Sequence, residues 1–121
     1  MKFSFSDGFA GNLVRSYEPG LLRINDRIYD HSLVITATSL RRWEVADAAL
    51  LTAADLRVLL TEEPEVVVLG TGERQRFPPR AVRHALLDAG VGLEIMSTAA
   101  AARTYNVLVA EDRRVVAALI L

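Results

Sequence analysis

The chain has 121 residues, of which 51% are hydrophobic and 24% charged, and its formal net charge at pH 7 is −1. This length fits one domain, residues 1–121, with one core, and the small net charge excludes a global field that would attract nucleic acid or anionic membrane. The chain has no cysteine, which excludes disulfides, thiolate catalysis and thiolate metal sites and is typical of a reducing compartment.

The chain carries no hydrophobic segment of the kind that inserts into a membrane. Its longest run without a charged residue, residues 31–40, is far shorter than the ~20 residues that a spanning helix needs. The N-terminal residues also lack the apolar core of a signal peptide. We therefore expect a cytoplasmic protein, and a leader that precedes this sequence remains the alternative.

The first third of the chain reads as antiparallel β-structure. Asn25 and Asp26 form a two-residue turn signal between two short apolar segments, which indicates a β-hairpin. Residues 39–45, with the only tryptophan, Trp43, read as a connector. The strands expected in this part are residues 13–17, 21–24, 27–29 and 31–36.

The second part alternates helix and strand. Thr52 and Asp55 have the spacing of a capping box, and Pro64 ends the helix that follows. Strand–helix–strand order favours parallel pairing with right-handed crossovers. The sequence thus predicts an α/β fold, with a mixed sheet, helices packed on it and an N-terminal hairpin. The expected strands are 66–69, 93–96 and 115–121, and the expected later helices are 79–89 and 98–110.

The segment after residues 66–69 is the first candidate binding site. Gly70, Thr71 and Gly72 follow an unbroken apolar strand, at the place where α/β proteins carry their sites. Glycine lets backbone N–H groups face an anion, and Arg74 and Arg76 add donors for a phosphate or carboxylate. The pattern is neither a dinucleotide-binding loop nor a Walker loop. The alternatives are a tight turn with solvated arginines and a protein-binding surface.

Arg103, Tyr105 and Asn106 form a second polar cluster, within an otherwise apolar helix. Arg103 and Asn106 are three residues apart and therefore share a helix face. Polar groups on a helix that packs against a sheet need partners. Two interpretations stay open: a structural hydrogen-bond network, or a cleft shared with the glycine loop.

Other patterns give no catalytic or metal site. Arg80, His84 and Asp88 recur every four residues on the face opposite the apolar stripe, which is typical of a solvated face. His31 has no second ligand nearby in the sequence. The hydrolase motifs with a serine or a zinc-bound histidine pair are missing. We expect no cofactor, no metal and no catalytic residue.

Three strings of the second half together resemble the Mth-type family of domains of unknown function. They cover residues 69–79, 90–98 and 102–108, and Trp43 with the preceding hairpin resembles the family's N-terminal part. The resemblance implies a single three-layer α/β domain. Relatives include mitochondrial respiratory complex I assembly factors, which act through protein contacts, and an adipogenesis-associated protein. Many relatives carry a cysteine where this chain has Ala102, so a thiol-based role is not expected here.

On these observations we order the candidate functions of the protein. A non-catalytic protein-interaction or assembly-factor-like module comes first. A protein or enzyme that binds a small anion between the Gly70–Gly72 loop and Arg103–Asn106 is the alternative. Self-association as a homodimer is the third hypothesis.

Overall fold

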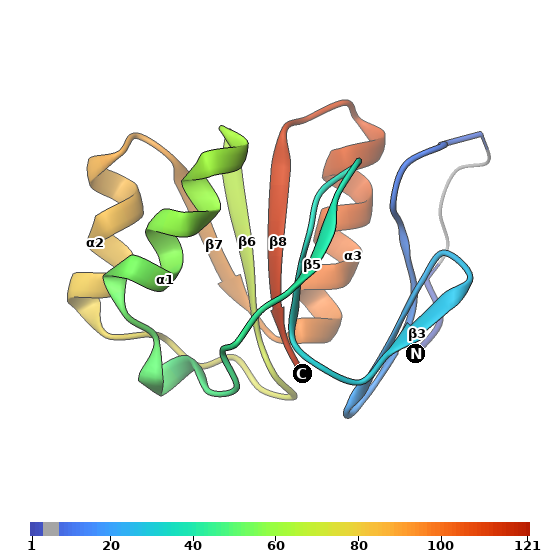
Figure 1. Ribbon diagram of the computed structural model, residues 1–121, viewed down its shortest axis with the longest axis horizontal. Helices are drawn as coiled ribbons and strands as arrows, with labels where there is room; N and C mark the ends of the chain where they lie inside the picture. Colours follow the sequence, from blue (N-terminus) through green and yellow to red (C-terminus); the bar gives the residue numbers. More distant parts are fainter. Residues whose placement is uncertain (4–7) are drawn as a thin grey trace.

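The computed structural model describes residues 1–3 and 8–121 (Figure 1). The strands are β1 (Val14–Glu18), β2 (Leu21–Ile24), β3 (Arg27–Tyr29), β4 (Leu33–Ile35), β5 (Leu40–Arg42), β6 (Val66–Thr71), β7 (Gly92–Met96) and β8 (Val115–Ile120). The helices are α1 (Ala53–Arg57), α2 (Arg80–Asp88) and α3 (Thr98–Ala110), with two 3-10 segments, η1 (Ala48–Leu50) and η2 (Val58–Glu62).

The first three strands form a small antiparallel sheet. The order is β1-β2-β3, and Ile24 pairs with Arg27 across the turn at Asn25 and Asp26. Asn25 has φ of +51°, a left-handed conformation that asparagine tolerates better than most residues. The hairpin signal in the sequence therefore identified this turn correctly.

The other five strands form a mixed sheet in the order β5-β4-β8-β6-β7. Strand β6 pairs in parallel with β7 and β8, while β4 runs antiparallel to β8 and β5. All six residues of β6 are buried, because helices cover both faces of the sheet at this strand. Since parallel strands end at the same edge, the segments after β6 and β8 emerge together, at the lower edge in Figure 1.

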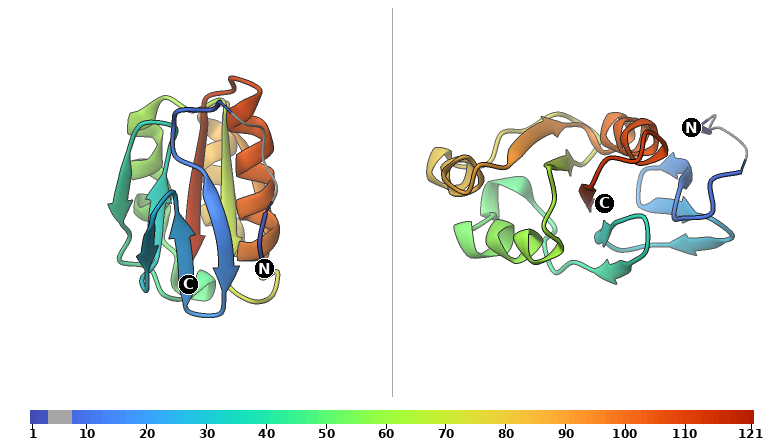
Figure 2. Two further views of the ribbon diagram at one scale, coloured as in Figure 1. Left: turned by 90° about the vertical axis from the view of Figure 1, so that its right-hand side faces the viewer. Right: turned by 90° about the horizontal axis from the view of Figure 1, so that it is seen from above.

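The helices and the small sheet form layers on the two faces of the five-stranded sheet (Figure 2). One core joins α3 and β1–β3 to alternate residues of β6 and β8, among them Val66, Val68 and Ala117. The other core joins α1, η2 and α2 to the opposite residues, among them Val67 and Leu69. None of the helices in the described part of the chain is long and apolar enough to cross a membrane.

The α/β class, the mixed sheet and the covering helices agree with the sequence prediction, and one detail differs. The connector at residues 39–45 contains strand β5, which pairs with β4 although its exposed arginines Arg41 and Arg42 give it no apolar alternation. The N-terminal hairpin lies in a sheet of its own, docked on α3, a placement that the sequence analysis left open. The Thr52–Asp55 capping box is present, with both of its hydrogen bonds formed.

Candidate functional site

The last residue of β6 and the loop after it, residues 71–76, are called here the Gly72 loop. Thr71 closes it from within: its Oγ1 donates to the carbonyl oxygen of Arg74 at 2.6 Å and accepts the N–H of Arg76 at 2.9 Å. Gly72 has φ of +103°, which a side chain would make unfavourable. A buried threonine at the end of a central strand thus sets the backbone path of the loop.

Thr98, the first residue of α3, ties the same loop to the rest of the sheet. The N–H of Gly72 donates to Thr98 Oγ1 at 2.8 Å, and the N–H of Thr98 donates to the Gly72 carbonyl at 2.8 Å. Thr98 Oγ1 in turn donates to the carbonyl of Ile120 at 2.6 Å. The Gly72 N–H is therefore used in an intramolecular hydrogen bond. It does not face an anion, in contrast to the interpretation of the sequence.

The close approach of α3 to β6 depends on a second glycine. A Cβ at Gly70 would lie 2.9 Å from the Cα of Thr98 and 3.1 Å from the Cβ of Ala101. Both distances are too short for ordinary contact, and the nearer neighbour is backbone, which has little freedom to move. Gly70 is accordingly a packing residue, and it does not line the cavity beside the loop.

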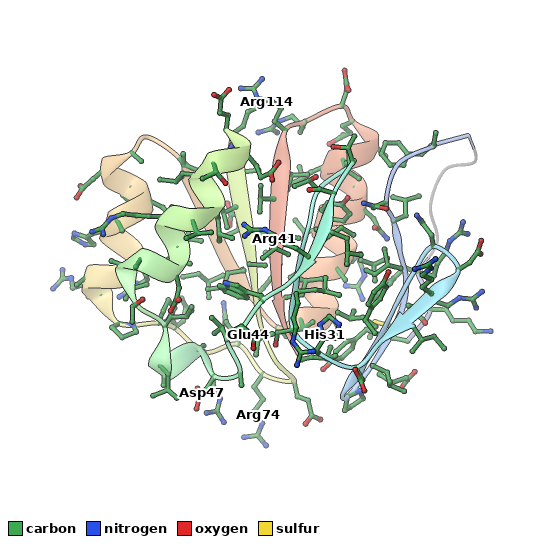
Figure 3. The ribbon with its side chains drawn as sticks, in the orientation of Figure 1. His31, Arg41, Glu44, Asp47, Arg74 and Arg114 are labelled. Carbon is green, nitrogen blue, oxygen red and sulfur yellow. The ribbon has the colours of Figure 1, made fainter. Side chains whose placement is uncertain are left out.

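The Gly72 loop borders a cavity of about 500 Å³ at the carboxyl edge of the parallel strands. Its other walls are the β1–β2 turn, the residues around η1 and the C-terminal end of β8 with Leu121. Figure 3 shows Arg74 and Asp47 at this edge, with Arg74 extending away from the body of the fold. The polar residues of the lining are Tyr17, Asp47, Thr71, Glu73, Arg74 and Arg76.

Charges of both signs meet in this cavity. Arg74 and Arg76 are exposed, and no ion pair or hydrogen bond within the described residues engages either guanidinium. Asp47 caps η1 by accepting the N–H of Ala49 at 2.9 Å. Burial, and then the charges of Glu73 and Glu18, raise the pKa of Tyr17, so its hydroxyl stays protonated at neutral pH. The site offers donors and acceptors together, which suits a polar protein surface as well as an anion.

Arg103, Tyr105 and Asn106 lie elsewhere, where α3 meets the N-terminal part of the chain. Asn106 is buried; its Nδ2 donates to the carbonyl of Val14 at 2.8 Å, and its Oδ1 accepts the N–H of Val14 at 2.9 Å. The buried Tyr105 donates its hydroxyl to the carbonyl of Asn12 at 2.8 Å. Arg103 is exposed and lies over the ring of Phe3, 5.8 Å from its centroid.

These contacts dock β1 on α3. Asn106 acts on Val14 as a neighbouring strand would, since it satisfies both backbone groups of one residue. Arg103 and Asn106 share a face of α3, as their spacing predicted, and that face is turned to the N-terminal part of the chain. None of the three residues lines the cavity beside the Gly72 loop.

The histidines are not brought together in the structure. His31 Nδ1 lies 2.9 Å from the carbonyl oxygen of Ser32, and its ring meets Tyr29 edge-on. His84 is exposed on α2 beside Arg80, in a groove against β7. Within residues 1–3 and 8–121, no cluster of three or more histidine, aspartate or glutamate side chains is arranged to hold a metal ion.

Sequence reasoning missed Tyr17, Asp47 and Thr98 as neighbours of the Gly72 loop. Tyr17 and Asp47 reach it from two other segments, and no local pattern predicts such a meeting. Thr98 carried a usable signal, since it lies two residues after a parallel strand and opens a helix. Ser97, between the strand and Thr98, is the residue that caps α3.

Two known proteins are similar in sequence to most of this chain. A Francisella tularensis protein called "13 kDa major membrane protein" is 31% identical over 84% of this chain and 84% of its own. The Danio rerio "NADH dehydrogenase [ubiquinone] 1 alpha subcomplex assembly factor 3" is 31% identical over 92% of this chain and 65% of its own length.

A solved structure agrees with both the fold and the resemblance seen in the sequence. A Bordetella pertussis protein, described as an Mth938-like domain, matches with a TM-score of 0.81 and 32% identity over 99% of this chain and 92% of its own. Residues 14–120 match the family described as "Protein of unknown function (DUF498/DUF598)". This chain therefore belongs to the DUF498/DUF598 family, and its fold is similar to that of the Mth938-like domain.

Proposed function

We propose that this protein is a non-catalytic interaction module of the assembly-factor type, and that the Gly72 loop is part of its partner-binding surface. The observation that carries the proposal is the pair Arg74 and Arg76: exposed guanidiniums, without an intramolecular partner among the described residues, on a loop fixed by Thr71 and Thr98. Because the loop backbone is already fixed, binding need not order it, and arginine is enriched in protein interfaces.

Two further observations support this reading. The cavity beside the loop mixes Asp47 and Glu73 with the arginines, so it offers acceptors as well as donors. A relative at 31% identity is named as an assembly factor for NADH dehydrogenase, and such a factor acts on another protein.

The test is to capture partners from the native host by cross-linking to the full chain. Arg74→Ala/Arg76→Ala is compared with the matched control Arg41→Ala/Arg57→Ala, which removes two exposed arginines elsewhere. We expect the loop variant to lose a specific partner that the wild type and the control retain. Fractionation of the same host tests the accompanying proposal of a cytoplasmic location, since one relative is named a membrane protein.

A small anion is the second candidate ligand, because Arg74 and Arg76 both line the same cavity. Hydrogen bonds to charged groups contribute about 1.5–3 kcal/mol each, so two guanidiniums could hold one phosphate or carboxylate. Thermal-shift measurements with inorganic phosphate, nucleotides and small carboxylates test this candidate. Stabilisation that disappears in Arg74→Ala/Arg76→Ala would favour it over the protein partner, and no shift at millimolar anion would exclude it.

A further inference from the structure

A second surface of the molecule, between α2 and β7, combines an unpaired strand edge with apolar and cationic side chains. It contains a groove of about 630 Å³ whose lining includes Phe77, Arg83, Leu87, Leu93 and Ile95. Phe77 and Leu87 are each 60% exposed, a large fraction for side chains of this size. Neither residue belongs to the lining of the cavity beside the Gly72 loop, so the two surfaces are distinct.

Strand β7 lies at the end of the five-stranded sheet and, within the described part of the chain, has β6 as its one neighbour. The N–H of Gly92 donates to the carbonyl of Glu65, towards β6. Because successive residues of a strand alternate their backbone groups, Leu93 and Ile95 turn theirs to the open side. On that side the amide of Gln75 donates to the Ile95 carbonyl at 2.8 Å, and no other described side chain bonds to Leu93 or Ile95. The Gln75 side chain thus takes one hydrogen-bonding position that an additional strand beside β7 would use.

The α2 side of the groove carries donors that lack acceptors. Arg83 lies over the ring of Phe77, with Cζ 5.6 Å from the centroid, and its Nε is buried without a hydrogen-bond partner within the described residues. Arg80 is exposed beside it. Glu94 also borders the groove, but Leu93 and Ile95 pack with the α2 core, so by alternation its side chain leaves β7 on the other face of the sheet. Among the described residues Glu94 forms no ion pair with Arg80 or Arg83. A buried unsatisfied guanidinium nitrogen is unfavourable, and a carboxylate is its natural complement.

We propose that the β7 edge binds an extended segment of a different protein as an added strand, with an acidic side chain of that segment held by Arg80 and Arg83. The backbone of Leu93 and Ile95 would supply strand hydrogen bonds, and Phe77 and Leu87 would cover apolar side chains of the segment. This inference adds a second surface to the interaction role and does not depend on Arg74 or Arg76.

Charge argues against a second copy of this chain as the added strand. An antiparallel two-fold pairing that uses the outward groups of both Leu93 and Ile95 is centred on Glu94. It would set Glu94 directly opposite the Glu94 of the copy, and like charges in that arrangement are destabilising. A foreign strand avoids this when it places a basic or neutral residue opposite Glu94. The side chains of the expected segment therefore alternate between the two faces of the sheet. Those that point towards α2 are acidic or apolar, and the one between them, which lies opposite Glu94, is basic or neutral.

A random-peptide phage library panned on the full chain tests the proposal. We expect enriched peptides with the alternation just described, and we expect the synthetic peptides to slow the amide hydrogen exchange of Leu93 and Ile95. Arg80→Ala/Arg83→Ala should weaken their binding at least about tenfold. Arg41→Ala/Arg57→Ala, the matched control, and Arg74→Ala/Arg76→Ala should leave binding unchanged. Gln75→Ala should bind equally or more tightly, because it uncovers the Ile95 carbonyl.

Several outcomes would overturn the proposal. These are the absence of enriched peptides, enrichment without acidic residues, or peptide binding that survives Arg80→Ala/Arg83→Ala. Protection of Leu93 and Ile95 that grows with protein concentration and without peptide, together with a dimer in light scattering, would assign the edge to a second copy instead. Partner loss in Arg74→Ala/Arg76→Ala bears on the Gly72 loop alone, so the two proposals fail separately.

Discussion

Two polar clusters that look alike in the sequence have opposite roles in the structure. Tyr105 and Asn106 of α3 are buried, and their polar groups bind the backbone of the segment that leads into β1 and of β1 itself. Arg74 and Arg76 of the Gly72 loop are exposed, and no described residue binds their guanidiniums. In this protein the buried polar residues of the apolar helix hold the fold together. The exposed arginines of the fixed loop are available to a partner.

The largest expected effect of a single substitution is at Asn106. Asn106→Ala leaves the buried N–H and C=O of Val14 without partners, and we expect a loss of about 3 kcal/mol in the free energy of unfolding. Urea denaturation measures it. Arg103→Ala, on the same helix face, should change stability by less than about 0.5 kcal/mol. Equal effects at the two positions would contradict the division between scaffold and surface.

Thr98 gives the next effect, because it joins the scaffold to the Gly72 loop. Thr98→Val keeps the shape of the side chain but removes the oxygen that accepts from Gly72 and donates to Ile120. We expect a loss of about 2 kcal/mol and faster hydrogen exchange of the Gly72 amide. A Gly72 amide that exchanges as slowly as in the wild type would show that the loop is fixed by other contacts.

Tyr105 makes stability depend on pH in the alkaline range. Burial raises the pKa of Tyr105 in the folded protein, while the unfolded phenol has a pKa of ~10. The contribution of the neutral Tyr105 to the free energy of unfolding is therefore fully present below pH ~10. It decreases as the pH rises further, by up to about 1.4 kcal/mol per pH unit. Urea denaturation between pH ~9 and ~11 measures the slope. Tyr105→Phe should flatten it in part, since the pKa of Tyr17 is also raised; an unchanged slope would contradict the assignment.

Local patterns predicted local structure well. The capping box at Thr52 and Asp55, the turn at Asn25 and the buried run of β6 depend on neighbours in the sequence, so they could be read directly. The partners of Asn106 and Thr98 could not, because Val14 and Ile120 come from distant segments. The same holds for β5, whose pairing with β4 overrides a sequence without strand alternation.

The candidate site was predicted in part for the same reason. The Gly72 loop lies at the carboxyl end of a parallel strand, as the order of elements indicated, and its two arginines are exposed. Whether the Arg103–Asn106 string faces that loop depends on the rotation of α3 about its axis. The docking of β1 on α3 fixes that rotation, and β1 lies some ninety residues earlier in the chain.

The most direct test of the central claim measures stability and partner binding together in Arg74→Ala/Arg76→Ala. Urea denaturation should show a change below about 0.5 kcal/mol, while cross-linking in the native host should lose a partner that wild type and Arg41→Ala/Arg57→Ala both retain. Partners identical to those of the wild type, from a variant that is equally stable, would contradict the account and remove the Gly72 loop from the interaction surface.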